Sequence, residues 1–219
     1  MHLDVIQVGA NTHDNVEDDY IAPRIIKQNL SAILIEPNKE CYNKLTERYK
    51  DNKNIITLNC VVSNQVFEDN TAKFYTVRKE ESDPHWFDLI HSLDLNFVKS
   101  HIAFGLQLGD NPFPDNKIIE VEVPVLSLSD IVSIYNIKSC LELYIDAEGH
   151  DWEVLQSYPF DKLHPNKIVL EHTHLSEKRK ELLDFLFEKD YDIFKFPTEV
   201  VGVKRNKNNK LEQIKSTLL

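Results

Sequence analysis

Acidic and imidazole side chains follow two apolar runs in the second half of the chain. The first run ends at Asp146, and the second ends at Glu171, which is followed by His172 and His174. Carboxylates and imidazoles can remove a proton from a hydroxyl group or hold a divalent metal ion. If the second run stays extended, His172 and His174 point to the same side of it. We therefore interpret Asp146, His172 and His174 as candidate catalytic residues, with a structural role for the histidines as the alternative.

A second group of chemically useful residues lies near the N-terminus. Gly9 opens the segment Gly9–His13 directly after an apolar run, and a glycine there lets the backbone approach a ligand closely. Glu36 ends the next apolar run, at a longer interval from the glycine than the about 20 residues usual in dinucleotide-binding proteins. A carboxylate in this place can accept both hydroxyls of a ribose, and Pro37 stiffens the turn beside it. The alternative for Glu36 is a solvent-exposed carboxylate at a strand end.

These residues are positioned by short β-branched runs that alternate with helical patterns. Such alternation predicts βαβ units and a parallel sheet with helices on both faces. Two further runs at the C-terminal end, joined by a turn at Pro197-Thr198, predict an antiparallel strand pair that closes the sheet. The predicted strands are Leu3–Val8, Ala32–Ile35, Ile55–Val62, Leu141–Asp146, Lys167–Glu171, Tyr191–Phe196 and Glu199–Lys204. We predict a Rossmann-like α/β fold in one domain spanning residues 1–219.

Apolar residues at helical spacing predict the helices between these strands. Ser176 is the expected N-cap of the last helix. The residues expected on the buried faces are Ile21, Ile25, Ile26 and Leu30; Cys41, Leu45 and Tyr49; Trp152, Val154 and Leu155; and Leu182, Leu183, Leu186 and Phe187.

The segment 78–116 breaks this rhythm, because its apolar residues have no clear period. It is rich in aromatic and histidine residues, namely His85, Trp86, Phe87, His91, His101, Phe104 and Phe113. A long irregular insertion of this kind is uncommon unless it serves binding. We interpret it as an acceptor lid or, equally, as a partly helical decoration packed on the sheet edge.

Composition excludes several classes of function. The 219 residues carry a formal net charge of −11, which repels a phosphate backbone, so we expect no nucleic acid partner. Three widely spaced cysteines indicate a reducing compartment rather than a disulfide framework. The N-terminal segment has no secretion signal pattern, and no apolar stretch is long enough to span a bilayer. We expect a cytoplasmic protein without a membrane partner, and no pattern predicts an oligomeric state.

Several segments, in this order along the chain, resemble the FkbM family of S-adenosylmethionine-dependent methyltransferases. The most specific segment is Tyr144–Leu155, which reads YIDAEGHDWEVL. The other segments are Val5–Asn11, Ile35–Asn38, Asn59–Asn64, Val123–Asp130 and Glu171–Leu175.

The resemblance implies a class I methyltransferase that uses S-adenosylmethionine to methylate a hydroxyl of a sugar, glycan or other small molecule. It implies that Glu36 binds the ribose, with Pro37 beside the adenosine, and that Asp146 faces the transferring methyl group. By the same analogy, the methionine end of the cofactor lies along Gly9, Ala10 and Asn11, and the adenine borders the turn that contains Asn59, Cys60, Val61 and Ser63.

Two departures from the family pattern leave other functions open. Gln7 stands where the family usually has an acidic residue, and His13 stands where it commonly has glycine. They motivate the alternative of a non-catalytic adenosyl-binding or scaffold protein. A nicotinamide-dependent oxidoreductase is a weaker alternative because the chain has no G-x-G-x-x-G motif. A divalent metal at Asp146, Glu171 and His174 is a variant that we do not expect.

Overall fold

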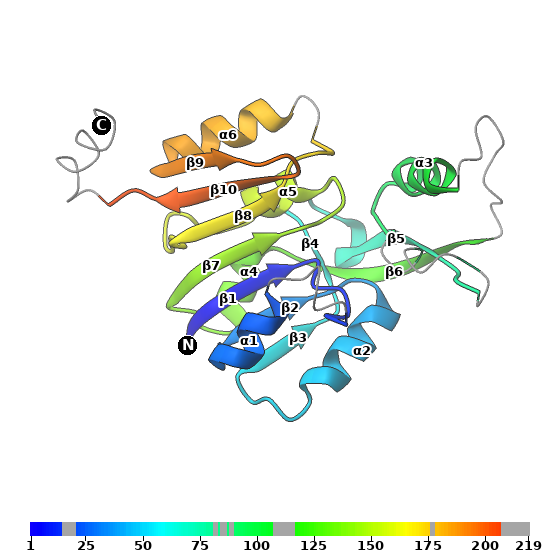
Figure 1. The fold of residues 1–219 in the computed structure, drawn as a ribbon, viewed down its shortest axis with the longest axis horizontal. Coiled ribbons are helices and arrows are strands. Elements are labelled where there is room, and N and C mark those ends of the chain that lie inside the picture. The colour runs from blue at the N-terminus through cyan, green and yellow to red at the C-terminus, as the bar shows by residue number, and fades with distance from the viewer. Residues whose placement is uncertain are drawn as a thin grey trace.

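A seven-stranded sheet forms the centre of the protein (Figure 1). The computed structural model describes residues 1–14, 21–80, 83, 87, 90–106, 117–175 and 178–206. The strands of the sheet are β1 (His2–Val8), β2 (Ala32–Ile35), β3 (Ile55–Leu58), β7 (Ser139–Ile145), β8 (Lys167–Glu171), β9 (Tyr191–Lys195) and β10 (Glu199–Lys204). Their spatial order is β3-β2-β1-β7-β8-β10-β9. The pairs from β3 to β8 are parallel, whereas β10 is antiparallel to both β8 and β9. The predicted α/β fold with an antiparallel C-terminal pair is therefore confirmed.

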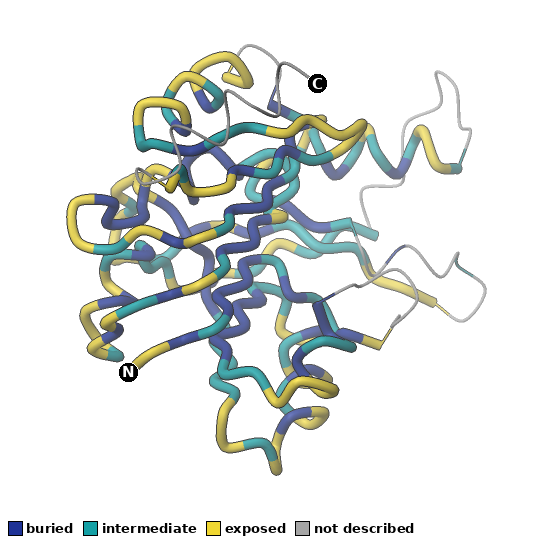
Figure 2. The backbone as a smooth tube through the Cα atoms, turned by 60° about the vertical axis from the view of Figure 1, so that its left-hand side comes forward, coloured by how far each residue is buried: buried dark blue, intermediate teal, exposed yellow. Residues whose placement is uncertain are grey.

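Helices cover both faces of this sheet because successive strand residues point to opposite sides. Ile6 and Val8 of β1 pack with one set of helices, whereas Val5 packs with the other set. The first set is α4 (Leu128–Ile134), α5 (Asp151–Gln156) and α6 (Lys178–Glu188), and the second is α1 (Ala22–Gln28) and α2 (Lys39–Tyr49). The buried residues run through the middle of the sheet between these layers (Figure 2).

A smaller three-stranded sheet, in the order β4-β6-β5, extends from this body (Figure 1). It consists of β4 (Val61–Val62), β5 (Thr71–Val77), which follows a short 3-10 turn at Glu68–Asn70, and β6 (Ile118–Leu126). The sequence analysis predicted neither β5 nor β6. The two strands enclose the segment 78–116, and the described part of that segment contains an 11-residue helix, α3 (Leu95–Gly105). His85, Trp86 and Phe113 lie outside the described residues.

The predicted single strand Ile55–Val62 is wrong. The chain leaves the large sheet after Leu58 and joins the small sheet at Val61. The turn between them is held by the Asn59 side chain, whose amide donates to the backbone carbonyls of Glu36 and Pro37, both at 2.9 Å.

Two predicted helix faces also need correction. Ile26 is exposed, because it follows Ile25 by one position on the helix and only Ile25 can face the sheet. Leu30 lies beyond the C-terminal end of α1. Phe187 is 60% exposed, and the guanidinium group of Arg205 lies 4.2 Å from the centre of its ring. The predicted cap Ser176 lies outside the described residues.

Candidate active site

The candidate site lies where the order of strands reverses between β1 and β7. From β1 the chain builds the sheet outward to β2 and β3, whereas β7 and β8 lie on the other side. In open parallel sheets, such a switch point leaves a crevice beyond the carboxyl ends of the strands. Gly9 and Asp146 are the first residues after β1 and β7, and the Asp146 N–H donates to the Val8 carbonyl at 3.0 Å.

Gly9 is required by the close approach of these two strand ends. Its φ of +77° lies in the region that favours glycine. A Cβ atom at this position would stand 1.8 Å from the carbonyl oxygen of Asp146, a distance no real side chain tolerates. The structure thus gives Gly9 a packing role that the sequence analysis did not predict, and its contact with a ligand stays a prediction.

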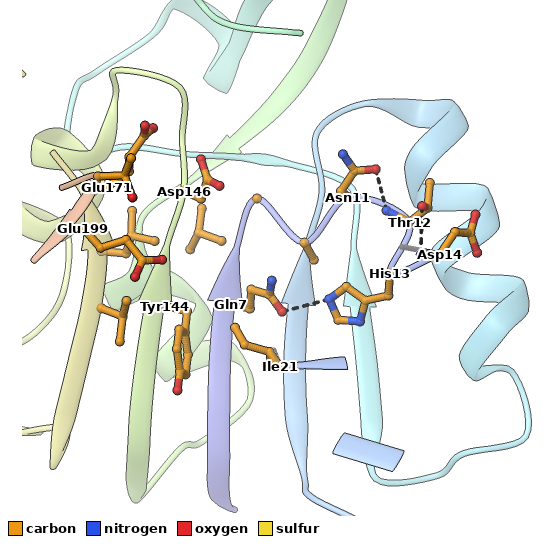
Figure 3. Close-up of a pocket in the computed structure, with 16 residues that line it drawn as sticks. Gln7, Asn11, Thr12, His13, Asp14, Ile21, Tyr144, Asp146, Glu171 and Glu199 are labelled. Atoms are coloured by element: carbon orange, nitrogen blue, oxygen red, sulfur yellow. Dashed lines mark hydrogen bonds between the residues drawn. The ribbon is translucent and has the colours of Figure 1, made fainter. Parts of the chain in front are cut away.

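A cavity of about 370 Å³ opens at the switch point (Figure 3). The loop 9–14 lies on one side of it, and the carboxylates of Asp146, Glu171 and Glu199 lie on the other. No lysine or arginine is among the described residues that line the cavity. The cavity is therefore negatively polarised, which suits a cationic or neutral ligand better than an anionic one.

The loop side of this cavity contains a buried hydrogen-bonded chain. His13 is 2% exposed, and its Nε2 lies 2.9 Å from Oε1 of Gln7 while its Nδ1 lies 2.8 Å from the Tyr49 hydroxyl. Figure 3 shows Gln7 and His13 pointing toward each other at the cavity wall. The two positions that depart from the family pattern are therefore in direct contact, and Tyr49 of α2 orients them.

Glu36 is fully buried, which excludes the alternative of an exposed strand-end carboxylate. Its Oε2 accepts from the Asn11 N–H at 2.8 Å, and its Oε1 accepts from the Asn38 N–H at 2.7 Å. His91 adds an imidazole, with Nε2 at 3.6 Å from Oε1. Burial raises the pKa of the Glu36 carboxyl, while His91 and the two backbone N–H groups act in the opposite direction.

A second, smaller cavity of about 40 Å³ lies on the other side of Gly9. It shares Val8, Gly9 and Asp146 with the larger cavity, so the two meet at the switch point. Its remaining lining residues are Pro37, Cys60, Val61, Val62, Phe74, His91, Leu93, Ala147, Glu148, His150 and Val154. Pro37, Cys60 and Val61 were predicted from the family resemblance to border the adenosine, and the structure brings these three together.

Carboxyl groups crowd the switch point on the β7 side. Asp146 lines both cavities, and partial removal from water by the surrounding protein, together with the charges of Glu171, Glu199 and Glu36, raises its pKa from 3.8 to about 7. Burial and the nearby Asp146 raise the pKa of Glu148 to about 9. These groups exchange protons near neutral pH, which is the property that a general base or acid requires.

The turn after Asp146 is shaped by Asp151, the first residue of α5. Its carboxyl accepts from the N–H groups of Ala147 at 3.1 Å and Gly149 at 3.2 Å. Gly149 has a φ of +90°, and Glu148 adopts a φ of +49°. Burial raises the pKa of Asp151 to about 8, with a further contribution from Asp146. The motif thus folds as a tight turn that points several carboxyl groups into one small region.

A third group lies at the outer side of this turn. Ligand atoms of Glu148, Glu171 and His174 lie within 4.8 Å of one another, so this set contains Glu148 where the sequence analysis placed Asp146. Helix α3 of the insertion borders it: the Phe97 ring stacks on His101 at 3.9 Å, and His174 meets both rings edge-on at 4.9 Å. The insertion therefore contributes aromatic side chains next to the carboxylates.

Comparison with known proteins identifies the family. The family model described as the methyltransferase FkbM domain matches residues 7–193. The chain belongs to this family. No curated protein sequence matches the chain significantly. Membership of the FkbM domain family favours methyl transfer over the nicotinamide-dependent alternative.

Three solved structures are similar to the chain at 12% identity each. Precorrin-6y C5,15-methyltransferase from Geobacter metallireducens GS-15 has a TM-score of 0.40, with 93% of this chain and 80% of that chain covered. A fibrillarin/Nop5p complex has a TM-score of 0.38, with 93% and 73% covered. The N-terminal domain of human METTL16 in complex with SAH has a TM-score of 0.36, with 94% and 63% covered.

Not every residue expected in the FkbM site lines a cavity. His172 is 3% exposed and its Nε2 donates to the Phe196 carbonyl at 3.0 Å. The strand ends at Glu171 and the chain turns, so the expected alternation of His172 and His174 does not hold. Ser63 is buried, with its hydroxyl 2.9 Å from Nε2 of His150. Asn59 holds the turn described above. These residues support the site from outside the two cavities.

The sequence analysis did not assign some residues to the site that the structure places there. Glu199 opens β10 and is paired with Glu171 in the antiparallel register, which brings its carboxylate into the larger cavity. His91 reaches Glu36 from the insertion, and Tyr49 bonds to His13 from α2. The predicted closing strand pair was a usable signal for Glu199. No local pattern links His91 to Glu36.

Proposed function

We propose that the chain is an S-adenosylmethionine-dependent O-methyltransferase that acts on a hydroxyl group of a sugar, a glycan or another small molecule. The observation that supports this proposal most directly is that Asp146 borders both cavities where they meet beside Gly9. A ligand with its adenosine in the smaller cavity and its amino-acid part over the loop 9–13 would have its sulfur near Asp146. This arrangement matches the roles that family membership suggests for these residues.

The cofactor would be held mainly by the β1 and β2 ends. Glu36, which lines neither cavity but lies 3.6 Å from His91 of the smaller one, would accept the ribose hydroxyls, while Pro37, Cys60 and Val61 would pack against the base. Ala10 and Asn11 would lie along the methionine part.

Asp146 would act as the general base. S-adenosylmethionine, when bound, supplies a methyl group already activated by its positive sulfur. Asp146, with its pKa near 7, would accept the proton of the acceptor hydroxyl as the oxygen–carbon bond forms and the carbon–sulfur bond breaks. Alignment of the acceptor with the methyl group would supply much of the remaining acceleration. His174, 3.4 Å from Glu171, is the second candidate because it lies at the acceptor side.

The acceptor would be uncharged or cationic rather than anionic. Carboxylates that include Glu171 line the larger cavity, and Glu148 and His174 lie close to Glu171. The rings of Phe97 and His101 of α3 contact His174. Carboxylates accept hydrogen bonds from sugar hydroxyls, and aromatic rings pack on the apolar face of a sugar. We therefore propose α3, within the insertion 78–116, as the acceptor lid of a single methyltransferase domain.

A non-catalytic adenosyl-binding or scaffold protein is the second candidate function. The buried contact between Gln7 and His13 favours it, because both replace residues that the family commonly uses near the cofactor's amino-acid end. Tight binding of S-adenosylhomocysteine without methyl transfer to any acceptor would support this candidate. The cytoplasmic location and the absence of nucleic acid and membrane partners stay predictions. Among the described residues, no helix combines the length and apolarity needed to cross a bilayer.

Calorimetric titration with S-adenosylmethionine and S-adenosylhomocysteine tests the proposal. We expect the intact protein to bind both, and Glu36→Gln to weaken binding at least about tenfold, because the neutral amide is a poorer acceptor for two hydroxyls. Glu188→Gln, an exposed position on α6, is the matched control and should bind as the intact protein does. A screen of neutral sugars with labelled methyl donor then seeks the acceptor. Absence of any binding by the intact protein would overturn the proposal.

A further inference from the structure

His91 stands against the carboxylate that is expected to bind the ribose. Its Nε2 lies 3.6 Å from Oε1 of Glu36, and the residue also lines the smaller cavity. Glu36 has no exposed surface. A ribose that reaches the Glu36 carboxyl from the smaller cavity must therefore contact the His91 ring or turn it aside.

The other ring nitrogen of His91 has no hydrogen-bond partner in the part of the chain that the structure describes. The side chain is 8% exposed, yet Nδ1 is buried without a hydrogen bond in the structure. Leaving a buried polar atom unsatisfied costs about 1–3 kcal/mol, so each such atom calls for an explanation. Because a carboxylate faces Nε2, that nitrogen is expected to carry the hydrogen, which leaves Nδ1 as an acceptor.

The backbone around His91 is held in place from two directions. Ser92 exchanges backbone hydrogen bonds with Tyr75 of β5 at 2.9 and 3.1 Å. The Ser92 hydroxyl also donates to the Glu148 carbonyl at 3.1 Å, which ties the segment to the turn after Asp146. The Phe74 ring lies 5.5 Å from the His91 ring. The imidazole is thus held at the edge of the smaller cavity by the fold.

We propose that His91 is an adenosine-binding residue, whose Nδ1 accepts a hydrogen bond from the adenosine part of the cofactor. The donor is a ribose hydroxyl or the 6-amino group of the base. This inference rests on the proposed function, since it names a further ligand-binding residue of the same site. It gives the insertion a role in cofactor binding in addition to its proposed role toward the acceptor.

Three substitutions of His91 distinguish the contributions of its two ring nitrogens to cofactor binding. Asparagine can place a polar atom where Nδ1 stands, glutamine reaches the position of Nε2, and leucine keeps bulk without either. His164→Asn is the control for the same chemical change, because His164 is exposed and lines neither cavity. Circular dichroism and thermal unfolding confirm that each variant is folded.

Calorimetry with S-adenosylhomocysteine gives the outcome. We expect His91→Leu and His91→Gln to weaken binding about tenfold, the effect of one hydrogen bond to a buried group, and His91→Asn to stay within about threefold of the intact protein. The control should bind unchanged. Unchanged binding by folded His91→Leu, or equal losses in the asparagine and glutamine variants, would overturn the assignment to Nδ1.

Binding of a cofactor fragment shows whether a negative result contradicts the His91 inference alone or the proposed function as a whole. 5′-Methylthioadenosine lacks the amino-acid part, so His91→Leu should weaken its binding by the same factor as for S-adenosylhomocysteine. The corresponding inosine compound lacks the 6-amino group: if the intact protein binds it as well as the adenosine compound, the donor is a ribose hydroxyl. If the intact protein binds no adenosyl compound, the proposed function fails. If it binds them and only Glu36→Gln has an effect, the His91 inference alone fails.

Discussion

The two sides of the crevice treat their carboxylates differently. On the β2 side, Glu36 is fully buried but meets two backbone N–H groups and an imidazole. On the β7 side, Asp146, Glu171 and Glu199 face one another without a lysine or arginine among the described lining residues. The hydrogen-bond donors around Glu36 hold its carboxylate in one position, which suits the binding of a ligand that is always the same, such as a cofactor. Several carboxylates close to one another suit a place where protons are exchanged.

Burial raises the pKa of the Glu36 carboxyl as well, but on the β7 side like charges add to burial, and the pKa values there are about 7, 8 and 9. Asp146, Asp151 and Glu148 follow β7 within six positions, and each feels the charge of a neighbour besides its own burial. A carboxylate among like charges holds its proton to higher pH. The arrangement reduces the net charge of the site in the absence of ligand, and a cationic sulfur would favour loss of these protons. The following predictions test the contrast between the two sides.

The largest expected effect is on turnover. Asp146→Asn should lower the methyl transfer rate about 10²–10³-fold, because the amide cannot accept the hydroxyl proton, while S-adenosylhomocysteine affinity changes less than about threefold. Single-turnover assays with labelled methyl donor and calorimetry provide the two readouts. Glu199→Gln, which removes a neighbouring carboxylate, should keep turnover within about tenfold. Equal losses of rate and affinity in Asp146→Asn would make it a binding residue instead.

The next effect concerns the point where the two sides meet. Gly9→Ala should lower the free energy of unfolding by about 3 kcal/mol or more, because its Cβ would overlap the Asp146 carbonyl at 1.8 Å. Gly202→Ala is the matched control: its φ is unstrained and the nearest atom, Cδ1 of Tyr191, is 3.4 Å away. Urea denaturation should show less than about 1 kcal/mol for the control. A Gly9→Ala variant as stable as the intact protein would disprove the close approach.

A smaller effect is expected on the pH dependence of stability. The pKa of Glu148 is raised to about 9 in the folded state and is near 4.5 when unfolded, so the folded protein binds more protons between these values. Stability contributed by this group is present at pH 5 and is lost as the pH rises toward 9. The substitution Glu148→Gln should therefore raise the free energy of unfolding at pH 9 relative to that at pH 5, by at least about 1 kcal/mol.

Chemical denaturation at several pH values measures this difference. Glu188→Gln, an exposed carboxylate on α6, should leave the pH profile of the intact protein unchanged. A Glu148→Gln profile parallel to that of the intact protein would show that Glu148 titrates near its ordinary value.

The smallest expected effect is that of a chelator. Although Glu148, Glu171 and His174 lie close enough to share an ion, the proposed base is Asp146 and the methyl donor carries its own activation. Turnover should therefore be unchanged after treatment with EDTA. Loss of turnover that added Mg²⁺ or Mn²⁺ restores would contradict this and place a metal at the acceptor side. Glu171→Gln should then weaken the restoration, while leaving S-adenosylhomocysteine affinity intact.

Much of the fold could be predicted from the sequence because its cause is local. Four consecutive buried residues in β2, and the apolar run of β8, mark strands covered on both faces. The same patterns predict where the candidate site residues lie, because they stand directly after strands and the carboxyl ends of parallel strands meet at one edge of the sheet. Glu36 and Asp146 were therefore assigned to the crevice from their positions alone.

The strand Ile55–Val62 shows where a local pattern misleads. Its eight residues look like one strand, but the Asn59 amide binds two backbone carbonyls that lie after β2. Phe187 is a similar case, because its exposed ring lies against the guanidinium group of Arg205, directly after β10, and not in the core. In both examples the residue that makes the contact is distant in the chain from its partner, and the types of the side chains do not predict that contact.

The sequence by itself determined the alternation of strands and helices along the chain, the strand-end position of Glu36 and Asp146, and the place of a glycine directly after the first strand. Apolar periodicity and backbone freedom are properties of neighbouring residues, so they can be read along the chain. Only the tertiary structure decided that His91 stands beside Glu36, that Glu199 joins Glu171, and that several carboxyl groups titrate near neutral pH. Burial and charge interactions depend on separation in space, and this separation is set by how distant segments pack.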